Sequence, residues 1–499
     1  MILQNLGEYI REKKKLGNKL LIIDPEKEKT YSYFEMITLS ESVAAFLDEK
    51  GIQQNDKVAC ISTNRPEMII LFFGCLIRGA IFHPINPGLS SDEMTYVLDN
   101  SDSVIAFCEH DSEEKVKSLA LPTLNGLFRI DELMTFPEKS VSFQNVKLDD
   151  NAVLMYSSGT TGFPKGIVLT QRNLLVECES IARILHFSEH TRGIEMLPLF
   201  FSGGLFPNVF TIFLASGSIV LPRKFSKSQF WNHVKKYNVT WSFGVPTMLA
   251  YLLNPPENIS SQEISSFQFM STGAAPLPIE IANNFEKHFG KKVVEAYGLT
   301  ENVAWTTVND PKSPRYGSIG KPIDIAVMKV IDENGNEVLD GIEGQILIKG
   351  PHVFKEYYKN QEATQKTLID GWLHSGDRGY RNNEGYYFIT GRIKEIIKKG
   401  GVLISPVAID TVFYKHPAVK DAATVGIPDH LYGEEIVTFV SLKEGMNATE
   451  DEFFKLCEES LEKFKCPKEI FFIEEIPKGP SGKLLRRELL RKYSNKFEK

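Results

Sequence analysis

A run of hydroxyl residues and glycines followed by a lysine is the strongest chemical signal in this sequence. The eleven residues from Tyr156 to Gly166 read YSSGTTGFPKG and come directly after the apolar run AVLM. Glycines expose backbone N–H groups that bind phosphate oxygens, neighbouring hydroxyls add donors, and Lys165 supplies a positive charge. Because the run does not match GxxxxGK[ST], it predicts a polyphosphate-binding loop of a different type. The alternative is a flexible glycine–serine turn without a ligand.

Four shorter motifs that contain ionisable residues follow further along the chain. They read YGLTE (297–301), WLHSGD (372–377), GRIKE (391–395) and PKGPSGK (477–483). Taken one at a time, side chains such as Glu301, Asp377 and Lys483 are typical of solvated surfaces, and carboxylates also cap helices. Their chemical meaning therefore depends on their occurring together and in this order.

Together the five motifs resemble those of the adenylate-forming superfamily, which contains acyl-CoA synthetases, peptide-synthetase adenylation domains and firefly-luciferase-like enzymes. The resemblance spans nearly the whole chain and is closest to bacterial fatty-acyl-CoA ligases. It implies that a carboxylate attacks the α-phosphate of ATP, that pyrophosphate leaves, and that the acyl-AMP passes its acyl group to a thiol. The implied small molecules are a carboxylic acid, ATP, Mg²⁺, and CoA or the phosphopantetheine of a carrier protein.

The resemblance also implies roles for individual residues. Two anions meet in adenylation, so cations are needed where negative charge develops. Lys483 supplies positive charge on one side, and Thr160, Thr161 and Lys165 surround the leaving pyrophosphate on the other. Thr160 and Glu301 are the implied magnesium ligands, since this ion prefers hard oxygens, and Glu301 completes the catalytic set. The implied ATP- and AMP-binding residues are Ser157, Ser158, Gly159, Thr160, Thr161, Gly162, Lys165, Gly273, Ala274, Ala275, Glu295, Ala296, Tyr297, Gly298, Thr300, Asp377, Arg392 and Lys483.

Within that set, Asp377 and Arg392 are expected at the ribose. The small residues 273–275 would let adenine lie against the backbone, and Tyr297 would stack on its other face.

An apolar acyl site is expected from two other segments. Its predicted lining is Phe200, Phe201, Gly203, Gly204, Trp241, Phe243, Gly244 and Val245. Amino-acid-activating relatives keep an aspartate in the first segment, and none occurs here. Many CoA ligases have a histidine where this chain has Phe201. These features favour an uncharged acid, either a medium- or long-chain fatty acid or an aryl acid, and the alternative is that the aromatic residues are simply core.

The segment after GRIKE differs from that of many CoA ligases, so the identity of the thiol that accepts the acyl group stays open. Lys394 and Glu395 match the pivot about which the family's small domain swings between the two steps. The thiol channel is assigned to Lys398, Gly400 and Gly401, because glycines let a pantetheine arm pass close to the backbone. Val402, Leu403 and Ala408 replace the usual aromatic, asparagine and glutamate. A carrier protein is therefore the alternative acceptor to CoA, and Lys399 is expected to be solvated.

Composition limits the other possibilities. The chain has 499 residues, a net charge of −7 and six scattered cysteines without zinc-ligand spacing. Neither a nucleic-acid partner nor a zinc site is expected, and a reducing, cytoplasmic location fits. Residues 196–222 carry no charge, but prolines and glycines interrupt them, so they predict buried core rather than a transmembrane segment. A non-catalytic acyl-nucleotide-binding homologue and a luciferase-like oxygenase are the remaining alternatives.

The elements that must position these residues alternate between short apolar strands and amphipathic helices. This alternation predicts an α/β fold, with two doubly wound, mostly parallel sheets in a large domain. After about residue 320, short β segments predict a β-barrel-like part, and the last hundred residues predict a small α+β domain. The expected boundaries are 1–391 for the adenylation domain, 392–395 for the hinge and 396–499 for the mobile domain. Strands are expected at TYSYF (30–34), EMLPLF (195–200) and IFFIEEI (470–476), and helices at PNVFTIFLAS (207–216) and TEDEFFKLCEESLEKF (449–464).

Overall fold

The structure is a computed structural model that describes residues 4–119, 121–141, 146–157, 164–253, 255, 259–479 and 484–493. Six residues that the sequence places in the site lie outside this range: Ser158, Gly159, Thr160, Thr161, Gly162 and Lys483.

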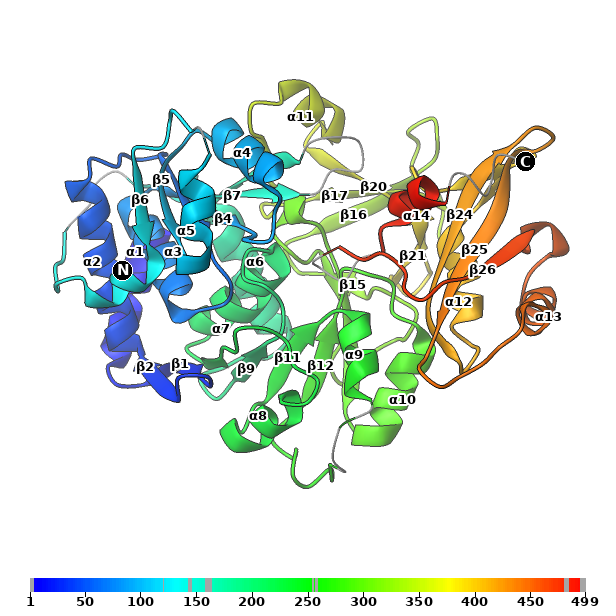
Figure 1. Cartoon of the computed structure of the whole chain (residues 1–499), viewed down its shortest axis with the longest axis horizontal. Helices are drawn as coiled ribbons and strands as arrows, with labels where there is room; N and C mark the ends of the chain where they lie inside the picture. Colours follow the sequence, from blue (N-terminus) through cyan, green and yellow to red (C-terminus); the bar gives the residue numbers. More distant parts are fainter. Residues whose placement is uncertain are drawn as a thin grey trace.

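Two large, mostly parallel sheets form the first part of the chain (Figure 1). The nine-stranded sheet has the order β15-β14-β13-β12-β11-β9-β10-β1-β2, and the seven-stranded sheet has the order β18-β8-β7-β4-β3-β5-β6. Among the described residues, antiparallel strands lie toward the edges, at β2, β14 and β15 in the first sheet and at β8 and β18 in the second. The strands of the first sheet are β1 (Leu20–Asp24), β2 (Lys29–Ser32), β9 (Arg192–Glu195), β10 (Ser218–Val220), β11 (Trp241–Gly244), β12 (Phe269–Thr272), β13 (Lys292–Tyr297), β14 (Thr307–Val308) and β15 (Lys321–Pro322). Those of the second are β3 (Lys57–Ile61), β4 (Ile81–Ile85), β5 (Ser103–Cys108), β6 (Gly126–Arg129), β7 (Asn151–Ser157), β8 (Lys165–Thr170) and β18 (Glu356–Tyr357).

Helices cover both sheets, and every residue of helix α3 is buried. Its sequence PEMIILFFGCLIR begins with a proline at the first turn and ends at Gly79 in the left-handed conformation, which are typical start and stop signals. The helices of this part are α1 (Leu6–Glu12), α2 (Tyr33–Glu49), α3 (Pro66–Arg78), α4 (Ser91–Asn100), α5 (His110–Lys117), α6 (Gln171–Ile184), α7 (Thr211–Leu214), α8 (Phe230–Tyr237), α9 (Pro246–Leu252), α10 (Ile279–Phe289) and α11 (Gln361–Thr367). Short 3₁₀ turns are η1 (Lys13–Leu16), η2 (Ile130–Thr135) and η4 (Thr300–Asn302), and η3 (Gly204–Phe210) is a π-helix.

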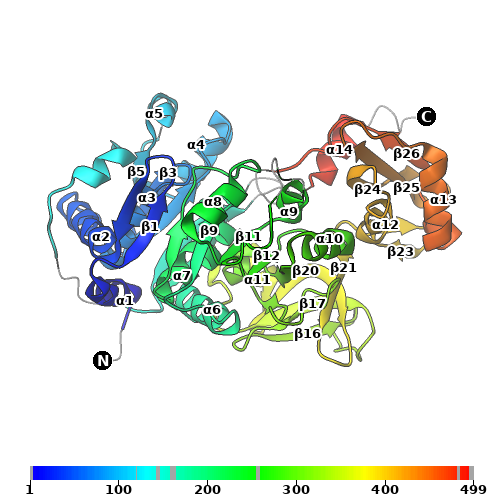
Figure 2. The ribbon, with the colours of Figure 1, turned by 90° about the horizontal axis from the view of Figure 1, so that it is seen from below.

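A curled antiparallel sheet and a small C-terminal domain complete the chain. The antiparallel sheet contains β16 (Val327–Ile331), β17 (Gly344–Lys349), β19 (Leu368–Ile369), β20 (Trp372–Arg381) and β21 (Tyr387–Arg392). The C-terminal part contains β22 (Ile397–Lys399), β23 (Val402–Ile404), α12 (Pro406–Phe413), β24 (Val419–Asp429), β25 (Gly433–Leu442), α13 (Glu450–Ser460), η5 (Lys463–Lys465), β26 (Glu469–Phe472) and α14 (Arg486–Lys492). Figure 2 shows this part at one end of the molecule, beyond β21. The predicted fold class is confirmed.

Three predicted element boundaries are wrong, one of them because of a capping box. The strand expected at 30–34 ends at Ser32, because Ser32 and Glu35 form a capping box that starts α2 at Tyr33. The helix expected at 449–464 ends at Ser460, and the strand expected at 470–476 covers Glu469–Phe472.

The strand expected at 195–200 is also wrong, because β9 covers Arg192–Glu195. The carboxylate of Glu195 accepts a hydrogen bond from the backbone N–H of Leu197 at 2.7 Å, so the chain turns out of the sheet there. The helix expected at 207–216 begins earlier, as a π-helix over Gly204–Phe210 that contains Pro207, and continues as α7. The wider π turn accommodates a proline that lacks an N–H donor.

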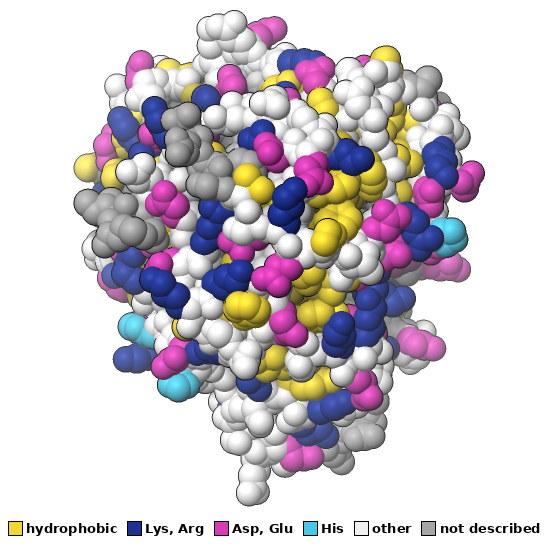
Figure 3. All heavy atoms as spheres, turned by 90° about the vertical axis from the view of Figure 1, so that its left-hand side faces the viewer, with side chains coloured by type: hydrophobic (Ala, Val, Ile, Leu, Met, Phe, Trp, Pro, Cys, Tyr) yellow, Lys and Arg dark blue, Asp and Glu magenta, His cyan; other side chains and the backbone are white. Residues whose placement is uncertain are grey.

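The uncharged run 196–222 is largely buried, with Leu205, Phe206, Phe210, Ile212 and Phe213 fully inaccessible. Within the described ranges, no helix combines the length and the hydropathy needed to cross a bilayer. On the face drawn in Figure 3, basic and acidic side chains are interspersed and neither sign gathers into a patch.

All six cysteines are unpaired. Five of them, Cys60, Cys75, Cys108, Cys178 and Cys457, are buried, and Cys466 is partly exposed.

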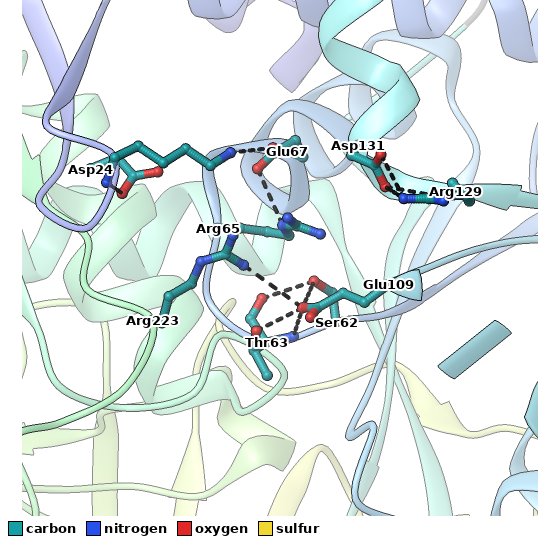
Figure 4. A network of polar contacts seen from close by, with 10 residues as sticks. Asp24, Ser62, Thr63, Arg65, Glu67, Glu109, Arg129, Asp131 and Arg223 are labelled. Carbon is teal, nitrogen blue, oxygen red and sulfur yellow. Dashed lines mark hydrogen bonds and ion pairs between the residues drawn. The ribbon is translucent and has the colours of Figure 1, made fainter. Parts of the chain in front are cut away.

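A polar cluster joins the carboxyl ends of β1, β3 and β5 (Figure 4). Ser62 and Thr63 donate three hydrogen bonds to one oxygen of Glu109, at 2.6 to 2.8 Å. In the same loop, the side chain of Asn64 donates to the carbonyl of Leu197 at 2.9 Å and accepts from the N–H of Leu199 at 2.8 Å. The seven-stranded sheet therefore fixes the loop after β9, which the sequence assigns to the acyl site.

Candidate active site

A buried carboxylate and two partners connect the WLHSGD, GRIKE and YGLTE motifs. Asp377 on β20 is the register partner of Arg392 on β21, and only 3% of it is exposed. One carboxylate oxygen lies 2.9 Å from Nε of Arg392, and the other accepts a hydrogen bond from the hydroxyl of Tyr297 at 2.6 Å. Burial and the negative charge of Asp377 raise the pKa of Tyr297. Desolvation alone would lower the pKa of Arg392, but the neighbouring anions, Asp377 first, raise it. The result is a fixed, charged acceptor suited to a vicinal diol.

The lysine of the phosphate loop and the glutamate of YGLTE meet at a tyrosine that the motifs did not indicate. Lys165 begins β8, and its ammonium lies 4.8 Å from the ring centroid of Tyr357 on β18. The hydroxyl of Tyr357 donates to Oε1 of Glu301 at 2.8 Å. Ser157 is the register partner of Lys165 at the end of β7. Sequence reasoning missed Tyr357 because it stands 56 residues beyond Glu301, outside every motif.

The predicted adenine segments lie next to each other at the carboxyl ends of β12 and β13. A Cβ at Gly273 would lie 2.6 Å from the carbonyl oxygen of Ala296, so the two strand ends approach closely. Ala274 has a φ of 65° and is exposed, whereas Ala275 is half-buried. The hydroxyl of Tyr297 is already committed to Asp377.

The side chain of Glu295 is buried and bonded to the backbone of Leu277. Only 6% of it is exposed, and burial raises its pKa to about 8, against the opposing effect of a hydrogen bond from the backbone N–H of Leu277. Its side chain therefore holds the loop after Ala275, and only its backbone remains near the nucleotide segments.

Gly298 is required by the close approach of the next turn. A Cβ there would lie 1.8 Å from the carbonyl oxygen of Ala304, far inside contact distance. We expect Gly298→Ala to lower the free energy of unfolding by about 3 kcal/mol or more, because backbone must move to relieve the clash, and to weaken ATP binding. Thermal unfolding with ATP titration measures both.

Gly88→Ala is the matched control, because Gly88 is exposed and its added Cβ would meet only the flexible side chain of Asn86. An unchanged melting temperature for Gly298→Ala would contradict the packing described here.

Residues of the predicted acyl and adenine segments meet around the ring of Phe243. A Cβ at Gly203 or at Gly273 would lie 3.3 or 3.5 Å from this ring, and the ring of Trp305 lies 5.0 Å from it between centroids. The loop after β9 thus touches the adenine segment through Phe243. Ser202 also approaches Thr300 of YGLTE, with 3.4 Å between their hydroxyl oxygens.

The other predicted acyl residues occupy different positions. The indole of Trp241 donates to Ser271 at 2.9 Å and packs on Phe187, so it belongs to the core. Phe200 and Phe201 form an edge-to-face pair at 4.7 Å. The three remaining residues are close-packed backbone or core positions, namely Gly204, Gly244 and Val245.

Trp305 and Glu177 are further site neighbours that the motifs did not indicate. Glu177 on α6 is fully buried, and one of its oxygens accepts from the backbone N–H groups of Ala304, at 3.0 Å, and Trp305. Burial raises the pKa of Glu177. This carboxyl group therefore fixes the turn that joins the YGLTE motif to the aromatic wall.

At the expected hinge, Lys394 is exposed and Glu395 forms an ion pair with Arg486 at 3.3 Å. Arg486 begins α14, three residues after the PKGPSGK segment ends, and also pairs with Asp410 at 2.6 Å. The hinge is thus connected to the segment that carries the predicted catalytic lysine.

In the predicted thiol channel, Lys398, Gly400 and Gly401 are exposed, and both glycines have positive φ values. The expectation of a solvated Lys399 is wrong: 7% of it is exposed, and its ammonium lies 2.6 Å from a carboxylate oxygen of Glu435. Alternation along β22 turns this side chain inward, opposite to Lys398.

No cluster of three or more His, Cys, Asp or Glu side chains suited to a metal occurs among the described residues. Magnesium bound mainly through substrate phosphates does not need one, because this ion commonly takes one or two carboxylates and keeps water ligands.

Comparison with known proteins agrees with this geometry. The model of the AMP-binding enzyme family matches residues 11–358, and that of the AMP-binding enzyme C-terminal domain matches residues 408–483. Sulfoacetate–CoA ligase from Cupriavidus necator is 34% identical over 95% of this chain and 94% of its own. Long-chain-fatty-acid–CoA ligase from Bacillus subtilis is 32% identical over 93% of this chain and 90% of its own. ATP-bound MatB from Rhodopseudomonas palustris superposes with a TM-score of 0.94 at 26% identity, over 99% of this chain and 100% of that one.

The chain therefore belongs to the AMP-binding enzyme family, within the adenylate-forming superfamily. Within that family it is an acid–thiol ligase of the AMP-forming type. Both conclusions confirm the resemblance drawn from the motifs.

Proposed function

We propose that this enzyme converts an uncharged, apolar carboxylic acid, ATP and CoA to acyl-CoA, AMP and pyrophosphate, with Mg²⁺. Two clusters carry the proposal, namely Asp377 with Arg392 and Tyr297, and Tyr357 with Lys165 and Glu301. They are neighbours, because the charge of Glu301 contributes to the raised pKa of Arg392. One group is suited to a ribose, and the other provides a cation and a carboxylate for a metal-bound polyphosphate.

In the first step, Asp377 accepts hydrogen bonds from the ribose hydroxyls while Arg392 keeps it oriented. Lys165 and the hydroxyls of the phosphate loop neutralise the leaving pyrophosphate, and Lys483 stabilises the charge that develops as the acid attacks the α-phosphate. Glu301 fits a magnesium ligand, since Tyr357 occupies only Oε1 and no contact within the described ranges uses Oε2. When bound, Mg²⁺ would neutralise phosphate charge.

In the second step, we propose that the domain from residue 396 onward swings about residues 392–395 and brings Lys398, Gly400 and Gly401 to the acyl-AMP. The pair between Glu395 and Arg486, which links the hinge to α14, supports a role for these residues in setting domain orientation. The domain boundaries 1–391, 392–395 and 396–499 are part of this proposal.

A medium- or long-chain fatty acid is the proposed substrate class. The lining around Phe243 is aromatic or glycine, and residues 196–222 contain no charge that could pair with a second acidic group. The named relatives act on acids as different as sulfoacetate and long-chain fatty acids. The proposed substrate class therefore rests on the residues that line the acyl site of this chain. An aryl acid is the second candidate, because Phe243 and Trp305 present flat surfaces.

A carrier protein is the second candidate acceptor. Val402 and Leu403, which replace polar or aromatic residues of many CoA ligases, are each 41% exposed, and Leu431 is 71% exposed. Exposed apolar side chains suit a protein surface better than a nucleotide. For localisation, we propose the cytoplasm, since free cysteines suit a reducing compartment.

Acid-dependent exchange of labelled pyrophosphate into ATP tests the proposal. Purified enzyme with Mg²⁺ is assayed with fatty acids of increasing chain length, aryl acids, dicarboxylic acids and amino acids. We expect exchange with apolar acids and thioester formation on CoA. No exchange with any acid would reject the function, exchange with dicarboxylic acids alone would reject the acid class, and transfer only to a phosphopantetheinylated carrier protein would reject CoA.

A further inference from the structure

We infer that Tyr357 is a positioning residue for adenylation, which keeps the cation for the phosphates and the carboxylate for the metal apart and correctly oriented. This inference rests on the proposed roles of Lys165 and Glu301. It assigns to one side chain two tasks, one for its hydroxyl and one for its ring.

The hydroxyl of Tyr357 orients Glu301. It donates to Oε1 at 2.8 Å, and the backbone carbonyl of Glu301 accepts from the N–H of Phe354 at 2.7 Å. The backbone of Glu301 is therefore held by the residue two positions before β18, and its side chain is held by β18 itself. One carboxylate oxygen is committed, so the other is the one left for a metal ion.

The ring of Tyr357 holds the ammonium of Lys165 at 4.8 Å from its centroid, within cation–π distance. This contact satisfies the cation without using an anion. No ion pair joins Lys165 to Glu301 among the described residues, although both side chains contact the same tyrosine.

Separation matters because Lys165 and Glu301 carry opposite charges at one site. A direct ion pair between them would have to break before the lysine could reach a phosphate and the glutamate a metal ion. At a partly desolvated site such a pair is costly to open. The ring and hydroxyl of Tyr357 hold both groups through weaker, directional contacts that nucleotide can replace.

Tyr357 is itself rigidly placed. On β18 it is the register partner of Ile167 in β8, and its backbone N–H donates to Thr364 at 2.9 Å. Phe354 packs edge-to-face on its ring at 4.8 Å, and 6% of the residue is exposed. Because β8 also begins with Lys165, the strand pairing sets the distance between the lysine and the ring.

Two substitutions separate the two tasks. Tyr357→Phe removes the hydroxyl and keeps the ring, so we expect the half-saturating Mg²⁺ concentration in pyrophosphate exchange to rise about tenfold. The KM for ATP at saturating Mg²⁺ should stay within about twofold. Tyr357→Leu removes both contacts, so the KM for ATP should also rise about tenfold.

Tyr358→Phe is the matched control. The next residue also donates its hydroxyl to a carboxylate, Asp102, at 2.8 Å, and also has a lysine ammonium, Lys57, 4.8 Å from its ring. These partners lie outside the proposed site, so Mg²⁺ dependence and the KM for ATP should match wild type.

The outcomes distinguish this inference from the function on which it rests. If Lys165→Met and Glu301→Gln impair exchange but both Tyr357 variants behave as wild type, the positioning role is rejected and the site assignment stands. Equal changes in Mg²⁺ dependence and KM for Tyr357→Phe, with a lowered melting temperature, would show a purely structural role and also reject it. Lack of exchange by the wild-type enzyme would reject the function itself.

Discussion

Replacing Lys483 with alanine is expected to slow acyl-adenylate formation by at least about a thousandfold, while ATP affinity stays within about threefold of wild type. Attack of a carboxylate on a phosphate concentrates negative charge, and removing one well-placed neutral donor from such a site already costs about a hundredfold to a thousandfold. A full positive charge should contribute at least as much. ATP binding should persist, because the proposed ribose-binding residues Asp377 and Arg392 are unchanged in this variant. Pyrophosphate exchange measures the first quantity, and calorimetric ATP titration measures the second.

The described residues of the PKGPSGK segment include a second lysine, Lys478. Lys478 forms a β-bridge with Leu484, and Leu485 donates to the carbonyl of Pro477 at 2.9 Å, so the described residues at the two ends of this segment pair with each other. The ammonium of Lys478 is committed to Asp421 at 2.8 Å. Lys478 is therefore not a substitute for Lys483.

Lys468→Ala is the control for Lys483→Ala. Lys468 belongs to the same domain, and its side chain is 55% exposed and only 3.7 Å from its partner carboxylate. Its loss should leave both adenylation and ATP binding unchanged. If Lys483→Ala retained near-wild-type exchange, the assignment of the catalytic cation would be wrong.

Replacing Asp377 with alanine is expected to weaken ATP binding by about a hundredfold or more. Hydrogen bonds to a charged group contribute about 1.5–3 kcal/mol each, and two ribose hydroxyls would lose their acceptor. The change also leaves Arg392 and the hydroxyl of Tyr297 without the carboxylate that satisfies both. We therefore also expect a lower melting temperature, and calorimetry together with thermal unfolding measures the two effects.

A nucleotide lacking the ribose hydroxyls separates binding from stability. Wild-type enzyme should bind 2′,3′-dideoxy-ATP much more weakly than ATP, whereas Asp377→Ala should bind both alike. Asp340→Ala is the control, because Asp340 pairs with Nε of Arg381 at 2.6 Å on the same antiparallel sheet but is exposed. Undiminished discrimination by Asp377→Ala would remove its role at the ribose.

Local signals in the sequence were sufficient for much of the fold. The alternation of short apolar strands and amphipathic helices predicted the α/β fold with two mostly parallel sheets, and the structure has both sheets. The failures occur where a side-chain hydrogen bond to the backbone or an irregular helical turn decides the outcome. Glu195 ends β9 by bonding to the backbone beyond it, and the π-helix from Gly204 has no distinctive sequence pattern.

The residues of the site fall into two groups as well: those that motifs in the sequence predict, and those whose role depends on contacts between distant parts of the chain. Asp377 and Arg392 could be placed together from their motifs, and the structure pairs them across adjacent strands. Glu177 could not be connected with the turn at Trp305, because 128 residues separate them and a buried glutamate has no distinguishing neighbours in sequence. Lys399 was misplaced, because its burial depends on Glu435 in a different strand.

The distribution of the six cysteines has a practical consequence for assay. Consumption of CoA is readily followed with a chromogenic disulfide such as DTNB, which also titrates accessible protein thiols. With five cysteines buried and only Cys466 partly exposed, the folded enzyme should contribute at most about one equivalent of background colour per chain. A stepwise rise toward six equivalents during heating would then report unfolding in the same cuvette.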